Sequence, residues 1–166
     1  MVERTLVLVK PDAVKRQLTG RIVERFENAG LKIVGMKMIW VDDNFAKKHY
    51  REDDIAKRHG ETVWKNLLKF IVEGPVVAFV LEGNDVIEVV RKICGPTEPK
   101  SAQPGTIRGD FAHHSYSSAD AGQKAIRNVV HSSANKDDAK LEIALWFLEK
   151  ELHTYKSVQD FCMYWM

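Results

Sequence analysis

Residues 5–9 read TLVLV and residues 76–81 read VVAFVL, and these two apolar runs decide the fold class. A short run without polar alternation is typical of a strand that is buried on both faces of a sheet. Residues 31–41 and residues 125–130 predict two further strands. In the strand over residues 31–41, alternation places four large side chains on one side of the sheet, namely Val34, Met36, Met38 and Trp40.

Segments with helical periodicity separate these four strands. The spacing of apolar residues predicts helices over residues 19–29, 44–50, 63–73 and 137–152. A further helix is expected between Asn84, which suits an N-cap, and Gly95, which ends the helix. Four strands interspersed with helices predict an α/β or α+β sandwich in which the helices cover a single sheet.

The remaining segments are expected to be irregular. Residues 51–54 (REDD) indicate a solvated connector, and residues 95–109, with three of the five prolines, predict a long, stiffened loop. Residues 111–123 are rich in Ser, Ala, His and Asp and predict a surface loop. Within that loop, His113 and His114 are a weak candidate for a metal site, because neighbouring loop residues rarely point together.

Composition limits the class of protein. The chain has 166 residues and a net charge of +2, with 45% apolar and 29% charged residues, which are the proportions of one globular domain. The near-neutral charge removes any broad electrostatic case for a nucleic-acid binder, and no apolar run approaches the ~20 residues of a membrane helix. The start of the chain lacks the apolar region of a signal peptide. Two cysteines, Cys94 and Cys162, are too few for a disulfide framework, so a cytoplasmic location is expected.

Two stretches could carry chemistry, although the sequence lacks the signatures G-x-x-x-x-G-K-[ST] and G-x-G-x-x-G of common nucleotide-binding loops. Residues 128–135 (NVVHSSAN) place His131 at the end of an apolar run. This histidine is either exposed at the rim of the sheet or a hydrogen-bonded structural residue. Residues 104–111 (PGTIRGDF) place Arg108 between glycines, either as a guanidinium for phosphate oxygens or as a surface arginine in a turn.

The chain resembles the nucleoside diphosphate kinase family from near its first residue to about Tyr155. The motifs that carry the resemblance are RT at 4–5, VKPDAV at 9–14, HY at 49–50, GPVVA at 74–78, GPTEP at 95–99, PGTIRGDF at 104–111, NVVHSS at 128–133 and EIALWF at 142–147. Each motif alone is modestly specific, but in this order they are very hard to obtain by chance. The resemblance implies a ferredoxin-like sandwich, with a four-stranded antiparallel sheet covered by helices, as a single domain over residues 1–166.

The resemblance also implies an activity. Members of the family move the γ-phosphate of a nucleoside triphosphate, typically ATP, onto a nucleoside diphosphate by a ping-pong mechanism through a phosphohistidine. By its place in the motif, that histidine would be His131. A neutral imidazole is a competent nucleophile near pH 7. Glu142 would bond the imidazole and fix its tautomer. Tyr50 and Ser133 would complete its surroundings.

The phosphates and the ribose need their own contacts, since the transferring group is polyanionic. By the same resemblance, Lys10 would contact the γ-phosphate and the ribose 3′-hydroxyl, and Asn128 would bond the ribose. Arg91 and Thr97 would hold the β-phosphate, while Arg108 would reach the transferred group. Mg²⁺ is the expected cofactor, and it would come with the nucleotide phosphates without side-chain ligands from the protein.

The base-binding end departs from the family pattern. Val63 falls where the family has its stacking phenylalanine, and Trp64 falls next to it. Because ring stacking contributes about 1–3 kcal/mol per base, we expect a small register shift that lets Trp64 supply the ring. Leu67 belongs to the same nucleotide-binding end, and Ala125 matches the apolar residue opposite.

Two insertions lengthen the chain relative to the family pattern, near residues 51–62 and near residues 112–124, the second by about ten residues. Ser132 replaces the usual glycine after the histidine, and Ala134 replaces an acidic residue, but the chemistry demands neither group. Family members are oligomers, so we expect a homo-oligomer, with a hexamer favoured. The expected partners are nucleoside triphosphates and diphosphates, with no membrane and no nucleic acid.

The alternative function is a non-catalytic relative that binds nucleotide, or a protein partner, through the same fold. Such a relative is expected to have lost the histidine or a phosphate contact. The sequence retains all of these positions, which favours the enzyme.

Overall fold

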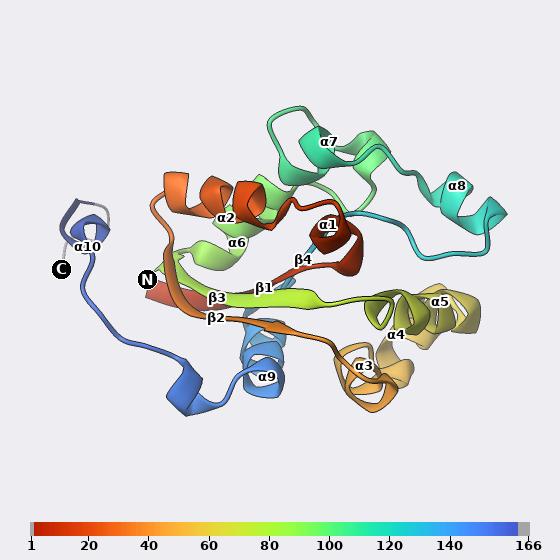
Figure 1. Ribbon diagram of the computed structural model, residues 1–166, viewed down its shortest axis with the longest axis horizontal. Coiled ribbons are helices and arrows are strands. Elements are labelled where there is room, and N and C mark those ends of the chain that lie inside the picture. The colour runs from red at the N-terminus through yellow and green to blue at the C-terminus, as the bar shows by residue number, and fades with distance from the viewer. Residues whose placement is uncertain (1, 163–166) are drawn as a thin grey trace.

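The computed structural model describes residues 2–162, and its sheet has four strands in the order β2-β3-β1-β4 (Figure 1). The strands are β1 Val2–Val9, β2 Lys32–Ile39, β3 Val76–Asn84 and β4 Val130–Ser132. Each runs antiparallel to its neighbours, and Leu8 of β1 pairs with His131 of β4. This is the ferredoxin-like sheet that the resemblance implies.

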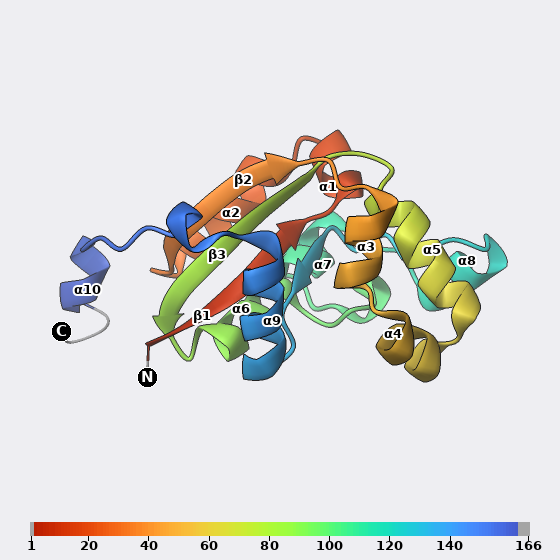
Figure 2. The ribbon, with the colours of Figure 1, turned by 90° about the horizontal axis from the view of Figure 1, so that it is seen from below.

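Helices cover both faces of the sheet (Figures 1 and 2). The upper face in Figure 1 carries α1 Pro11–Lys15, α2 Thr19–Asn28, α6 Val86–Cys94 and α7 Ile107–Phe111. The lower face carries α3 Asp43–His49, α5 Glu61–Ile71 and α9 Lys136–Trp146, with α4 Glu52–His59 packed on α5. The shorter elements are the 3₁₀ turns η1 Pro99–Ser101 and η2 Glu149–Glu151, and the helices α8 Tyr116–Ala121 and α10 Val158–Cys162. None of the described helices is long and apolar enough to cross a membrane.

The alternation of side chains along residues 6–9 of β1 explains why this stretch is apolar at every position. Val7 and Val9 join the core cluster under α2 and α6, whereas Leu6 and Leu8 join the cluster that α3, α5 and α9 cover. All four side chains are fully buried. The sheet is therefore covered on both sides, as the unbroken apolar runs predict.

The fourth strand was wrongly predicted over residues 125–130, since β4 begins only at Val130. Val129 has a φ of +62°, and the N–H of Val130 donates to the carbonyl of Asn128 at 2.7 Å, which closes a three-residue γ-turn. A β-branched residue adopts this conformation only under tertiary constraint. The turn interrupts the extended run, so that β4 begins one residue before His131.

Strand β2 does not keep Val34, Met36 and Met38 on one side, as its alternation predicts. Its register shifts by one position between Ile33 and Gly35, and beyond this bulge the side chains exchange faces. Met36, Met38 and Trp40 are consequently 46%, 61% and 67% exposed. Because β2 is an edge strand, they form an apolar strip along the outside of the sheet.

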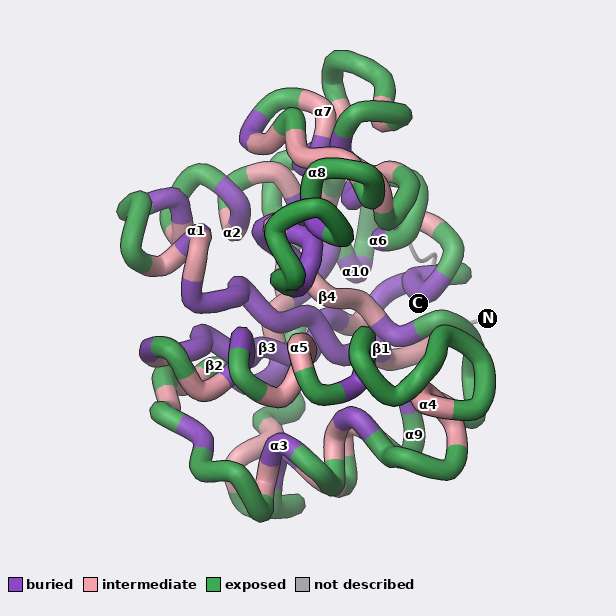
Figure 3. Tube along the Cα trace, turned by 90° about the vertical axis from the view of Figure 1, so that its right-hand side faces the viewer, coloured by how far each residue is buried: buried purple, intermediate pink, exposed green. Residues whose placement is uncertain are grey.

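Three segments expected to be irregular contain helices. The loop over residues 95–109 contains η1 and the first residues of α7. Residues 52–54 of the predicted connector belong to α4, and the loop at residues 111–123 contains α8, and both of these helices are mostly exposed (Figure 3). The helix expected to start at Asn84 has Asp85 as its N-cap residue instead, because Asn84 ends β3. The helix predicted over residues 137–152 ends at Trp146.

Candidate active site

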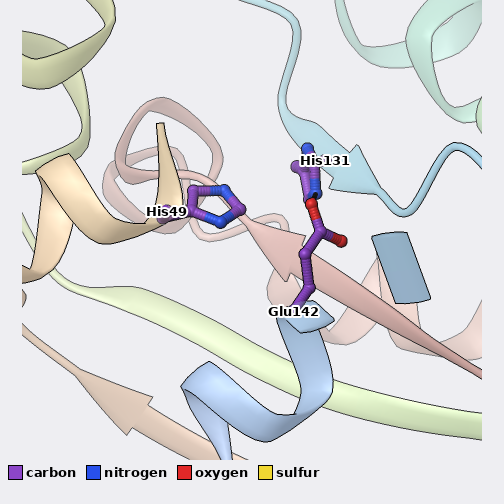
Figure 4. Close-up of side chains that lie close together, drawn as sticks. All are labelled: His49, His131 and Glu142. Atoms are coloured by element: carbon purple, nitrogen blue, oxygen red, sulfur yellow. Dashed lines mark hydrogen bonds and ion pairs between the residues drawn. The ribbon is translucent and has the colours of Figure 1, made fainter. Parts of the chain in front are cut away.

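His131 and Glu142 form the centre of the site (Figure 4). β4 presents the imidazole and α9 presents the carboxylate, whose Oε1 lies 2.8 Å from Nε2 of His131. The other carboxylate oxygen accepts a hydrogen bond from the hydroxyl of Ser133, which is itself fully buried. These contacts bring together three residues that were predicted to lie together.

The carboxyl of Glu142 is held in its ionised form. Burial opposes ionisation, but the neighbouring His131, together with His49 and the Ser133 hydroxyl, outweighs burial and lowers the pKa of Glu142 to about 2. An ionised carboxylate only accepts hydrogen bonds, so the proton of the bond lies on Nε2 of His131. In the neutral imidazole, this leaves the lone pair on Nδ1.

A second histidine lies beside the first. The His49 ring, from the end of α3, meets the His131 ring edge-on with centroids 4.8 Å apart (Figure 4). Burial lowers the pKa of His49 to about 3, which keeps this ring neutral beside His131. Its Nδ1 lies 3.3 Å from the indole nitrogen of Trp146, while Nε2 is buried without a hydrogen-bond partner among the described residues.

Tyr50 follows His49 and is also buried. Its hydroxyl has no hydrogen-bond partner among the described residues, and burial raises the pKa of the phenol. The hydroxyl therefore remains a neutral donor at the wall of the cavity that His131 also lines. A buried hydroxyl left without a partner is a candidate contact for a bound substrate.

Lys10 stands where β1 turns into α1, with only 5% of its surface exposed. Its ammonium donates to the side-chain oxygen of Asn128 at 2.7 Å, and the amide nitrogen of Asn128 donates to the carbonyl of Thr97 at 2.9 Å. Burial, and after it repulsion from Arg108, lowers the pKa of Lys10 to about 7. An anion that binds beside Lys10 would therefore stabilise the charged form of its ammonium.

Arg108 is buried and donates to backbone carbonyls. The bonds run to Gly95 at 2.6 Å, to Val130 at 2.8 Å and to Asn128 at 3.4 Å. Burial lowers the pKa of this guanidinium. Three of the five N–H groups of an arginine are used in these bonds, so the structural and phosphate-binding roles are compatible.

The backbone turn at Val129 joins these groups. The carbonyl of Val129 accepts from the N–H of Lys10 at 2.9 Å, and its N–H donates to a carboxylate oxygen of Asp12 at 3.2 Å. The second carboxylate oxygen of Asp12 is buried without a hydrogen-bond partner among the described residues. Asp12 and His49 are functional candidates whose roles the sequence analysis did not identify, although both belong to the motifs that it quotes.

A cavity of about 350 Å³ lies beside His131. The predicted site residues that line it are Lys10, Tyr50, Val63, Leu67, Arg91, Thr97, Arg108, Asn128 and His131. Arg91 and Thr97 are exposed at its mouth, whereas Glu142 and Ser133 support His131 from behind. The cavity has the size of a small-molecule site, and one end of it is strongly cationic.

Trp64 is placed elsewhere. Its indole is 8% exposed, packs in the core cluster of α3, α5 and α9, and donates to the carbonyl of Tyr50 at 2.8 Å. It is not among the described residues that line the cavity. Stacking on a base would require this ring to leave the core and give up its hydrogen bond, so the structure does not support the register shift. Val63 and Leu67 face the cavity from the same helix.

Among the described residues, one group has a spacing that suits a metal ion. The candidate ligand atoms of His49, His131 and Glu142 lie within 4.8 Å of one another. The carboxylate and Nε2 of His131 already bond each other, and that bond accounts for their proximity. In the loop, Nδ1 of His114 accepts from the N–H of Arg127, a structural contact.

Comparison with known proteins identifies the family. A family model described as nucleoside diphosphate kinase matches residues 3–152. The nucleoside diphosphate kinase of Borreliella burgdorferi is 54% identical over 94% of this chain and 93% of its own length. That of Pyrococcus furiosus is 49% identical over 96% and 91%.

Solved structures agree with this assignment. A transition-state mimic of the Borrelia burgdorferi nucleoside diphosphate kinase with bound vanadate and ADP superposes with a TM-score of 0.94 at 53% identity, covering 97% of this chain and 95% of that chain. The Halobacterium salinarum enzyme in complex with CDP gives a TM-score of 0.82 at 37% identity, with 98% of each chain covered. The chain belongs to the nucleoside diphosphate kinase family.

Proposed function

We propose that the chain transfers the γ-phosphate of a nucleoside triphosphate to a nucleoside diphosphate through Nδ1 of His131. The bond between Nε2 of His131 and the ionised Glu142 carries this proposal, because it leaves Nδ1 as the nucleophilic nitrogen. The family and its transition-state mimic with vanadate and ADP support phosphoryl transfer through a histidine. Covalent catalysis then divides the reaction into two displacements.

In the first displacement the lone pair of Nδ1 attacks the γ-phosphorus. The bond between this phosphorus and the oxygen that bridges it to the β-phosphate breaks, and the electron pair leaves with the nucleoside diphosphate. The imidazole becomes positively charged as the P–N bond forms, and Glu142 stabilises that charge. In the second displacement a terminal oxygen of another nucleoside diphosphate attacks the phosphorus, and the electron pair of the P–N bond returns to Nδ1.

The cationic end of the cavity would hold the phosphates. Lys10 would bind the γ-phosphate and the ribose 3′-hydroxyl, and Asn128 would bind the ribose. Arg91 and Thr97, both exposed at the mouth, would hold the β-phosphate. Arg108 would direct its unused N–H groups at the transferred phosphoryl group, and the Tyr50 hydroxyl would donate beside His131. Leu67 and Val63 would line the path to the base.

Mg²⁺ fits this site as a companion of the nucleotide. None of the described residues that line the cavity is acidic, whereas Lys10, Arg91 and Arg108 are cationic. Such a lining favours a metal ion that phosphate oxygens coordinate over one that a carboxylate cage holds. The ion neutralises phosphate charge when it is bound, and the protein side chains orient the phosphates.

The decisive experiment uses γ-labelled ATP with Mg²⁺ and no acceptor. The purified chain should acquire label that is acid-labile and alkali-stable, that maps to His131, and that moves to an added diphosphate. The variant His131→Gln should bind ADP and acquire no label. A wild-type chain that binds ATP without becoming labelled would instead be a non-catalytic nucleotide-binding module.

We further propose a homo-oligomer, with a hexamer favoured. The exposed side chains of Met36 and Met38 on the edge strand β2, and of Trp40 directly after it, support this, since an exposed apolar edge is usually covered. Light scattering coupled to size-exclusion chromatography measures the assembly directly. A chain that elutes as a monomer at micromolar concentration would rule out a stable assembly.

A cytoplasmic location is also proposed. Cys94 and Cys162 are free thiols, and the first of them is buried. Unpaired cysteines are typical of reducing compartments. Fractionation of the source cells would test this location.

A further inference from the structure

A second cavity of about 570 Å³ extends the nucleotide cavity outward. It lies between α5 and α8, which Figures 1 and 2 show at the same end of the molecule. The two cavities share five lining residues, His59, Val63, Leu67, Tyr116 and Ile126. The space that starts at His131 therefore continues past α5 to the helix formed by residues 116–121.

The α5 wall of this space offers no aromatic ring. Val63 faces both cavities, and it is 36% exposed. The neighbouring Trp64 is held in the core by its bond to the carbonyl of Tyr50. Ala125 and Ile126, which line the outer cavity, are small or aliphatic. A planar base between these walls would gain only apolar contact from them.

Tyr116 supplies a ring at the junction of the two cavities. It is the first residue of α8, lines both cavities and is 48% exposed. Half of its surface is thus available for a ligand.

The backbone fixes this residue relative to the phosphate end. The N–H of Tyr116 donates to Glu98 at 2.9 Å, and the N–H of Lys100 donates to the carbonyl of His114 at 3.1 Å. Both bonds tie the start of α8 to the loop that carries Thr97. The hydroxyl of Ser115 caps the helix by accepting from the N–H of Ser118. The backbone of Tyr116 is therefore anchored by the segment that would hold the β-phosphate.

We propose that Tyr116 stacks on the purine or pyrimidine base of the bound nucleotide and replaces the ring that is missing at Val63. The inference rests on the proposed function, because it takes His131 and Lys10 as the phosphate end. A nucleotide whose phosphates lie there would direct its base outward into the junction. Purines should gain more than pyrimidines, since their π-face is larger.

The test measures dissociation constants for ADP and for tripolyphosphate, which carries no base. Tyr116→Ala should weaken ADP binding roughly 5-fold to 150-fold, the range expected for the loss of one stacked ring. Tripolyphosphate binding should stay unchanged. Tyr116→Phe should retain ADP affinity, and Val63→Phe should restore affinity in the Tyr116→Ala background by returning a ring to α5.

Tyr155→Ala is the matched control, since Tyr155 is 47% exposed and packs beside Lys32, outside both cavities. Its ADP affinity should equal that of the wild type. Unchanged ADP affinity in Tyr116→Ala overturns the proposal, as does an equal loss for tripolyphosphate, which would assign Tyr116 a role in the phosphate loop. A loss found in His59→Ala and not in Tyr116→Ala also overturns it. Failure of the proposed function is a separate outcome, because it shows as a wild-type chain without label on His131.

Discussion

Replacement of Glu142 by glutamine tests the proposed chemistry at the residue whose pKa shift gives an expected free-energy change. The carboxyl side chain is 17% exposed, and its interactions with His131, His49 and Ser133 exceed the opposing effect of burial. At about 1.4 kcal/mol per pKa unit, the difference between 4.5 and about 2 corresponds to roughly 3.5 kcal/mol in favour of the ionised form. Glu142→Gln removes this charge and keeps an amide oxygen that accepts the N–H of His131.

The variant should slow phosphorylation of His131 about 10-fold to 300-fold. The upper value applies if the full ~3.5 kcal/mol acts on the transition state, and smaller values apply because part of that interaction already exists in the free enzyme. Single-turnover quenching with γ-labelled ATP measures the rate. Glu27→Gln, an exposed residue of α2 on the other face of the sheet, is the control and should match the wild type. A wild-type rate in Glu142→Gln would refute the role of the carboxylate.

The same carboxylate makes stability depend on pH. Its pKa is lower in the folded state than the ordinary 4.5, so its contribution is present above about pH 4.5 and is lost as the pH falls through about 2. Urea unfolding across this acid range should show a decline in the free energy of unfolding that is smaller in Glu142→Gln than in the wild type. An identical decline in both proteins would assign the acid sensitivity to other carboxyls.

Three further changes have defined outcomes. Because the pKa of Lys10 is about 7, ADP binding should take up a proton near pH 8 and weaken as the pH rises, and calorimetry in buffers of different ionisation enthalpy should find no such uptake in Lys10→Gln. Arg108→Lys cannot reproduce three carbonyl bonds and should lower the free energy of unfolding by about 2–4 kcal/mol in urea. Trp64→Phe should lower it by about 1–2 kcal/mol through the lost bond to Tyr50, and its ADP dissociation constant should match the wild type.

Three of the four strands were predicted correctly, and the clearest signal came from the two whose burial is two-sided. β1 and β3 contribute residues to both core clusters, so every position of residues 6–9 and 76–81 is apolar and the signal is local. The helix over residues 52–59 buries no side chain and carries an Asp54–Arg58 pair one turn apart. Without an apolar stripe, its charged start was interpreted as a connector. Apolar periodicity thus indicates which residues are buried, and it predicts a helix only where one face of that helix is buried.

The errors at the site have non-local causes. The position of Trp64 depends on a carbonyl fourteen residues earlier, at Tyr50, which no helical periodicity reveals. The shifted register of β2, which exposes Met36 and Met38, depends on a bulge against β3. By contrast, the contact between His131 and Glu142 was predicted from their positions in the family motifs. Composition and spacing alone do not predict such a tertiary contact.

The turn at Val129 shows why binding residues and fold cannot be separated in this chain. A buried β-branched residue at a φ of +62° costs on the order of 1–3 kcal/mol, and the surrounding bonds must hold it. Lys10 and Asp12 supply these bonds on one side of the turn. On the other side, Arg108 donates to the carbonyls of Asn128 and Val130, which flank the turn. The groups proposed to receive phosphate therefore also fix the backbone that presents His131. A substitution at Lys10 or Arg108 should for this reason change the placement of the nucleophile as well as the affinity for nucleotide, so loss of affinity alone measures only part of either role.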